Sequence, residues 1–267
     1  METLFLDPYT ILLLAGFIGF FMAFGIGAND VANSMGPSVG SKAITIKQAI
    51  IIAAIFEFLG AFFAGGEVTS TIRKGIVDPN IYSNDINIFV IGMMSALLAG
   101  GTWLYVASLR GWPVSTTHSI VGSIIGFVLI TKGVDAVSWS KVGNIAMSWV
   151  TSPLFSASLA FALYISAKKL ILESPEPKKA AIKYIPFYSV FVAIVIALVT
   201  ARKGLKHVGI QWSENEMYLF ILIFSAVVGL VTSFFLNRNK EKIMKDDGIE
   251  YAFGLLMIVS ASAMAFA

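Results

Sequence analysis

The chain has 267 residues, of which 57% are apolar and only 13% are Asp, Glu, Lys or Arg, and its mean hydropathy is +0.81. Ordinary soluble domains carry about 25% charged residues, so this composition excludes a soluble protein and indicates a chain whose main solvent is the lipid bilayer. The net charge of +3 lies in short basic clusters, which are typical of membrane topology signals and not of nucleic-acid binding, and the absence of cysteine excludes disulfides and thiolate sites.

Eight apolar stretches are long enough for membrane helices, which need about 20 apolar residues. They are 9–28, 48–66, 87–109, 114–130, 139–166, 185–201, 217–236 and 249–267. The expected fold class is therefore all-α, a polytopic membrane protein without a soluble domain. Three basic loops favour a multi-pass cell-membrane protein whose N-terminus lies outside, because Lys and Arg accumulate on the cytoplasmic side. The loops carry Lys42 and Lys47, then Lys168, Lys169, Lys178, Lys179 and Lys183, then Arg238, Lys240, Lys242 and Lys245.

Polar residues follow the first apolar stretch, where Asn29, Asp30 and Asn33 occur together. Asn29 and Asn33 are four residues apart and share a helical face, with Asp30 one step round. The nearby glycines and Pro37 are expected to break the helix, so that freed carbonyls join the side-chain oxygens around a hard cation. Oxygen ligands with a single carboxylate suit sodium, so these three residues are candidate sodium ligands. The alternative is an ordinary capped helix end at the membrane interface.

Glu57 places an ionisable carboxyl deep inside the second apolar stretch. Carboxylates within a membrane are costly and usually face a protein interior or a cavity. We therefore expect Glu57 to couple ions or to support the binding site. A protonated, hydrogen-bonded structural residue is the alternative.

The segment 110–119 predicts an anion site at the start of a helix. Proline is favoured in the first helical turn, so a helix is expected to begin near Pro113 with four hydroxyls in its opening turns. These belong to Ser115, Thr116, Thr117 and Ser119. Free backbone amides and the positive end of the helix dipole suit phosphate or sulfate, whereas hydroxyls bonded back to the helix are the alternative. His118 is a candidate for proton coupling or for supporting the site by hydrogen bonding.

Three motifs in this order resemble the inorganic phosphate transporter family, often called PiT. They are 27–33 (GANDVAN), 57–61 (EFLGA) and 113–119 (PVSTTHS), and they cover roughly the first half of the chain. The resemblance implies a fold with broken helices, a re-entrant hairpin and two inverted repeats. It also implies secondary active import of inorganic phosphate coupled to sodium by alternating access, with no cofactor besides the co-transported sodium ions.

The resemblance also assigns roles to residues. Asn29, Asp30 and Asn33 match candidate sodium sites, and Glu57 matches a functionally important acid. The candidate phosphate-binding residues are Ser115, Thr116, Thr117 and Ser119. The expected partners are phosphate, sodium and lipid, and not nucleic acid, and a homo-oligomer is left open.

The chain departs from the family pattern because it lacks a second Gly-Ala-Asn-Asp type motif and a second Ser/Thr-rich hairpin. Met264-Ala265-Phe266-Ala267 resembles Met22-Ala23-Phe24-Gly25, and the topology makes these two segments antiparallel, as an inverted repeat requires. We therefore expect a first repeat over 1–170, connecting helices and basic cytoplasmic loops over 171–248, and a truncated first helix of the second repeat over 249–267. The missing C-terminal half of the same protein is expected to complete the transporter.

Other functions are weighed against this one. A proton-coupled phosphate permease or a sulfate permease would use the same kinds of donors, and a membrane phosphate sensor would bind without transport. ATP hydrolysis is not expected, because no phosphate-loop signature with its lysine occurs. An intramembrane hydrolase that uses Ser or Thr with His118 is not expected either. Thr117 and His118 are also adjacent, so they would point about 100° apart on a helix, a poor arrangement for a nucleophile and its base.

Overall fold

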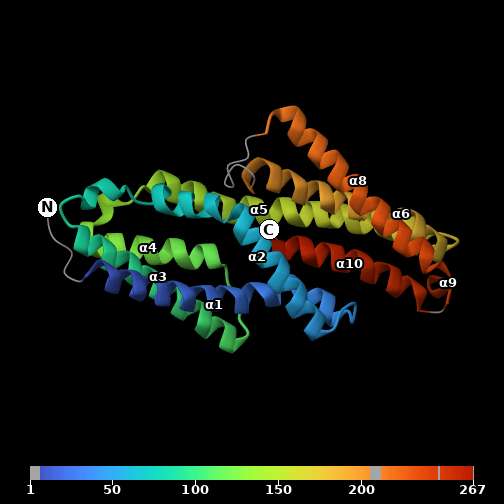
Figure 1. The fold of residues 1–267 in the computed structure, drawn as a ribbon, viewed down its shortest axis with the longest axis horizontal. Helices are drawn as coiled ribbons and strands as arrows, with labels where there is room; N and C mark the ends of the chain where they lie inside the picture. The colour runs from blue at the N-terminus through green and yellow to red at the C-terminus, as the bar shows by residue number, and fades with distance from the viewer. Residues whose placement is uncertain (1–6, 205–211, 246, 267) are drawn as a thin grey trace. The chain divides into compact units, whose positions relative to one another are not determined.

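The structure is a computed structural model that describes residues 7–204, 212–245 and 247–266, with the side chains of 64–75 and 203–204 excepted (Figure 1). These described residues are helical apart from turns and short connections, and they contain no strand. The all-α fold class is therefore confirmed. Ala267, the last residue of the repeated Met-Ala-Phe motif, lies outside the described residues.

Each of the eight predicted apolar stretches forms a helix. These are α1 (Pro8–Gly40), α2 (Ile46–Gly75), α3 (Ile86–Arg110), α4 (Thr116–Lys132), α5 (Trp139–Ala167), α6 (Pro177–Val199), α8 (Glu214–Arg238) and α10 (Gly248–Phe266). Shorter elements connect them, namely η1 (Pro79–Tyr82), η2 (Val134–Ala136), the π-helical turns η3 (Lys168–Leu172) and η4 (Thr200–Gly204), and α9 (Lys240–Ile243). Both α1 and α2 extend about nine residues or more beyond their predicted ends, since polar residues continue the helices.

The predicted break in the first helix is wrong. α1 runs without interruption from Pro8 to Gly40, with Pro37 inside it. A proline removes a single amide donor, and Pro37 lies in the last turn, so few helical bonds remain to be lost after it. Gly25 serves packing instead of a break, because a Cβ there would lie 3.2 Å from the Leu104 Cβ of α3.

The first compact unit comprises residues 1–33 and 68–149, and its centre is the α3–α4 hairpin. Its apolar core is formed by Ile76, Val77, Tyr82, Ala96, Val121, Ile124, Val128 and Val137. Residues just before α3 meet the end of α4, where the Asp85 carboxylate pairs with Lys132 and the Tyr82 hydroxyl lies 2.6 Å from that of Thr131. The two helices are therefore antiparallel, and their connection lies at the opposite end of the hairpin.

The second compact unit comprises residues 34–67 and 150–267, and in it α6 packs against both α8 and α10. Its apolar core contains Ile171, Ala180, Ala181, Ile185, Leu236, Ile243 and Ala252. Small residues allow close approach of the helices. Gly229 of α8 faces Val190 of α6, and Gly60 of α2 faces the Phe266 carbonyl of α10. The two units are groups of residues that contact one another, and they do not test the expected division into repeats. That division stays a prediction.

The outer helix faces are apolar, as a bilayer requires. Large side chains such as Leu13, Ile130 and Phe155 are at least 75% exposed. Seven helices in the described part of the chain are long and apolar enough to cross a membrane. α4 has only 17 residues, about 25 Å at 1.5 Å per residue, which is shorter than the bilayer core of about 30 Å. The protein is thus a polytopic membrane protein in which α4 is the short arm of a hairpin.

Candidate functional site

The connection between α3 and α4 is a tight turn with two defined caps. α3 ends at Gly111, whose φ of 66° is in the left-handed region that glycine tolerates, and the Trp112 amide donates to the Ala107 carbonyl at 2.9 Å. α4 begins at Thr116, because Ser115 is its N-cap and accepts a bond from the His118 amide at 3.3 Å. The predicted start near Pro113 is therefore a few residues early, since the serine side chain and not the proline ends the turn.

Asn29 ties α1 to this turn. Its side chain is 4% exposed, its Nδ2 donates to the Trp112 carbonyl at 3.1 Å, and its Oδ1 accepts from the Val114 amide at 3.4 Å. Asn33 Nδ2 also donates to Asn29 Oδ1, at 3.4 Å. Backbone groups outside a helix have no water to bond within a membrane, so they need protein partners. Asn29 supplies one donor and one acceptor for this turn and therefore fixes its position on α1.

Asp30 and Thr116 join the two predicted sets of ligands. The Thr116 hydroxyl lies 3.2 Å from one carboxylate oxygen of Asp30 and 3.1 Å from the other, and it donates to them. Asp30 belongs to the candidate sodium ligands and Thr116 to the candidate phosphate ligands. The structure thus brings the two sets into direct contact within one compact unit, which sequence spacing alone does not show.

The other hydroxyls at the start of α4 differ in their availability. Ser119 donates to the Ser115 carbonyl at 2.9 Å, which is the back-bonded arrangement of the alternative interpretation. Thr117 is exposed, so its hydroxyl is accessible. The His118 ring packs against the Trp149 ring of α5, with centroids 4.0 Å apart. The Thr117 hydroxyl is therefore accessible to an anion, and Ser115 Oγ accepts from the His118 amide but keeps its own proton. The Thr116 hydroxyl would have to release Asp30 before it could donate to an anion.

Glu57 lies on α2 in the second compact unit, where it is half-buried. Its contribution to the site stays a prediction.

The described residues hold no cluster of three or more His, Cys, Asp or Glu side chains. A cation here would therefore depend on one carboxylate with amide and hydroxyl oxygens, which is the ligand chemistry of sodium and not of a transition metal.

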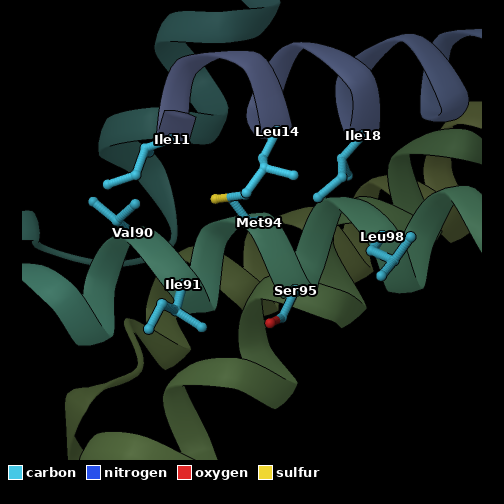
Figure 2. Close-up of a pocket in the computed structure, with 8 residues that line it drawn as sticks. All are labelled: Ile11, Leu14, Ile18, Val90, Ile91, Met94, Ser95 and Leu98. Atoms are coloured by element: carbon cyan, nitrogen blue, oxygen red, sulfur yellow. The ribbon is translucent and has the colours of Figure 1, made fainter. Parts of the chain in front are cut away.

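A second feature of the first unit is an apolar groove between α1 and α3 (Figure 2). It has a volume of about 220 Å³ and is lined by residues such as Ile11, Ile18 and Met94. Asn29 lies eleven residues beyond Ile18 on the same helix, which is about 16 Å along its axis. An oxyanion needs several hydrogen-bond donors, and Ser95 is the one hydroxyl among the residues that line this groove, so the groove is a poor match for an anion.

Sequence reasoning missed the residues that act through their backbone or their rings. Trp112 and Val114 contribute a carbonyl and an amide to the contact with Asn29, and Trp149 contributes an indole ring next to His118. Main-chain groups carry no residue-type signal. Only the rarity of tryptophan, which occurs five times in the chain, could have pointed to Trp112 and Trp149.

Comparisons with known proteins show which proteins this chain resembles. A curated relative from Haemophilus influenzae, named as a phosphate permease, is 49% identical over 93% of this chain and 60% of its own length. One from Helicobacter pylori, also named as a phosphate permease, is 39% identical over 96% of this chain and 48% of its own length. A solved structure described as "The sodium-dependent phosphate transporter" is 38% identical, with a TM-score of 0.87. The aligned region covers 96% of this chain and 63% of the chain in that structure.

The chain spans about three fifths or less of the length of these relatives. Most of this chain nevertheless matches a family model, since residues 26–267 match the model described as "Phosphate transporter family". The family consists of transporters and not of enzymes, and the resemblance drawn from the three motifs is confirmed. This chain, in which α1 contacts the α3–α4 hairpin, thus belongs to the phosphate transporter family.

Proposed function

We propose that this chain forms part of a secondary active transporter that imports inorganic phosphate together with sodium by alternating access. The observation that supports the proposal is the hydrogen bond between Thr116 and Asp30, because it joins a proposed anion donor to a proposed cation ligand. The similarity to a structure described as a sodium-dependent phosphate transporter supports sodium as the coupling ion. The protein is placed in the cell membrane with its N-terminus outside.

The Thr116 hydroxyl is the physical link between the two cargoes. Without a cation at Asp30, this hydroxyl donates to the carboxylate. A sodium ion that binds the carboxylate oxygens removes that acceptor, so the hydroxyl becomes available to donate to phosphate. Asn29 directly precedes Asp30 and accepts a bond from Asn33, and both side chains carry amide oxygens that suit a sodium ion. Binding of sodium would then raise the affinity for phosphate, and phosphate would raise that for sodium by the same factor.

The amide groups of the first turn of α4 complete the anion site. The first amides of a helix have no partner within it, and they lie at the positive end of the helix dipole. Together with Thr116 and Thr117 they offer donors without a permanent positive charge, which favours release of the cargo. A carboxylate near the anion that is not occupied by sodium would favour phosphate over sulfate, since protonated phosphate can donate its own hydroxyl to a carboxylate and sulfate cannot.

The proposed activity is that of the whole protein. A second Asn-Asp motif and a second hairpin, related to the first by an inverted repeat, are proposed to come from a C-terminal half that continues this sequence. Glu57 is proposed to take part in ion coupling, and His118 to support the start of α4. A homo-oligomer is compatible with this scheme but is not required by it.

The test is uptake of radiolabelled phosphate by the full-length protein in proteoliposomes, with sodium and proton gradients imposed separately. Uptake driven by sodium and not by protons is expected, with little inhibition by sulfate. Uptake that follows the proton gradient alone would identify a proton-coupled permease, and strong inhibition by sulfate would identify a general oxyanion permease. Phosphate binding without any uptake would identify a sensor.

A further inference from the structure

Arg110 places a cation at the turn that carries the proposed phosphate site. It is the last residue of α3 and directly follows the candidate membrane span Ile86–Leu109. Its side chain is exposed, and its guanidinium carbon lies 5.6 Å from the centre of the Trp112 ring. This distance is typical of a cation–π contact, in which the flat guanidinium covers the ring and its N–H edges stay free.

Within the part of the chain that the structure describes, no carboxylate pairs with Arg110. The described residues form three ion pairs, and none of them includes Arg110. Lys132 of the same compact unit is different, because it pairs with Asp85 at the opposite end of the α3–α4 hairpin. Arg110 is therefore a cation held next to the turn whose charge remains available to an anion.

Trp112 holds this cation in a fixed place relative to the site. Its amide donates to Ala107, its carbonyl accepts from Asn29, and its ring lies 6.3 Å from that of Trp103. Asn29 precedes Asp30 on α1, and Trp112 lies four residues before Thr116. One residue thus contacts both the cation and the α1 segment that carries the proposed ion ligands.

We propose that Arg110 is a steering residue, which raises the local concentration of phosphate at the turn before the anion reaches Thr116 and Thr117. This proposal rests on the proposed function. The aromatic contact and the exposed position of the side chain argue against a permanent ligand, since a bidentate arginine in an enclosed site would hold the cargo too strongly for release. An exposed charge acts at long range instead and is screened by salt, because the Debye length falls from about 30 Å at 0.01 M to about 3 Å at 1 M ionic strength.

The experiment measures phosphate KM and maximal uptake rate of the full-length protein in vesicles of zwitterionic lipid, at fixed sodium, with ionic strength raised by choline chloride. Arg110→Gln is expected to raise the KM by about 3- to 10-fold at low ionic strength and by less than about 2-fold at high ionic strength. The maximal rate should stay near that of the wild type. Arg110→Lys keeps the charge and should retain most of the wild-type KM and its salt dependence.

Lys132→Gln is the matched control, since it removes one positive charge from the same unit at the far end of the hairpin. It should leave the KM and its salt dependence unchanged. An unchanged KM in Arg110→Gln, a rise that does not depend on salt, or an equal rise in Lys132→Gln would overturn the steering role. An effect that appears only when anionic lipid is added would assign Arg110 to lipid headgroups and would also overturn it. Wild-type protein that takes up no phosphate would refute the proposed function itself, and the steering role with it.

Discussion

Thr116→Val tests the link between the two cargoes most directly. Valine has nearly the shape of threonine but cannot donate to Asp30 or to phosphate. One hydrogen bond contributes about 0.5–1.5 kcal/mol net, so the loss of a phosphate donor should raise the phosphate KM by about 2- to 13-fold. Sodium should respond in the opposite direction, because it no longer has to displace the hydroxyl from the carboxylate.

The size of the sodium effect follows from the geometry of the same bond. The hydroxyl lies 3.1 and 3.2 Å from the two carboxylate oxygens, which is long for a bond to a carboxylate. Hydrogen bonds between membrane helices average about 0.6 kcal/mol, so sodium binding measured without phosphate should tighten by about 3-fold. The sodium-dependent shift in the thermal unfolding of the purified full-length protein reports this affinity.

Thr102→Val is the control for Thr116→Val. Thr102 is exposed on α3 in the same unit, and its hydroxyl bonds back to the Leu98 carbonyl of its own helix. Neither the phosphate KM nor the sodium affinity should change in this variant. Weaker sodium binding in Thr116→Val would show that the hydroxyl oxygen is a sodium ligand and would refute the proposed link. An unchanged phosphate KM would show that Thr116 does not donate to the anion.

Three further substitutions test the frame around the site. Asn29→Leu leaves a carbonyl and an amide of the turn unpaired, at about 1–3 kcal/mol each, so the thermal unfolding temperature should fall clearly. The control is Asn237→Leu, which changes an exposed side chain bonded within its own helix and should alter the unfolding temperature little. Gly101→Ala places a Cβ 3.1 Å from an α1 backbone carbon and should cost about 1–3 kcal/mol. Gly19→Ala, with nothing within 4 Å, is its control, and equal unfolding temperatures would contradict the packing argument. Glu57→Gln should weaken sodium activation of uptake without lowering the unfolding temperature; the reverse result would identify a structural role.

The helices could be predicted from the sequence because lipid imposes a local rule. Each membrane helix satisfies its own backbone hydrogen bonds, so an apolar run of sufficient length is enough to predict it. The helical interruption before α4 was also predictable, since Gly111, Pro113 and Ser115 have strong local preferences. Pro37 was misread because the same local rule does not say whether a proline breaks a helix or lies in its last turn.

The residues of the candidate site could be named from the sequence, but their contacts could not. Asp30 and Thr116 are 86 residues apart, and Asn29 and Trp112 are 83 residues apart. These pairs meet because Gly25 and Gly101 let α1 approach α3 closely, and because the cap of α3 turns the chain back toward α1. Hydropathy and motif spacing determine which segments enter the membrane and which polar groups they carry. Only the tertiary packing decides that a candidate cation ligand and a candidate anion donor share one hydrogen bond, since that contact depends on how closely separate helices can approach.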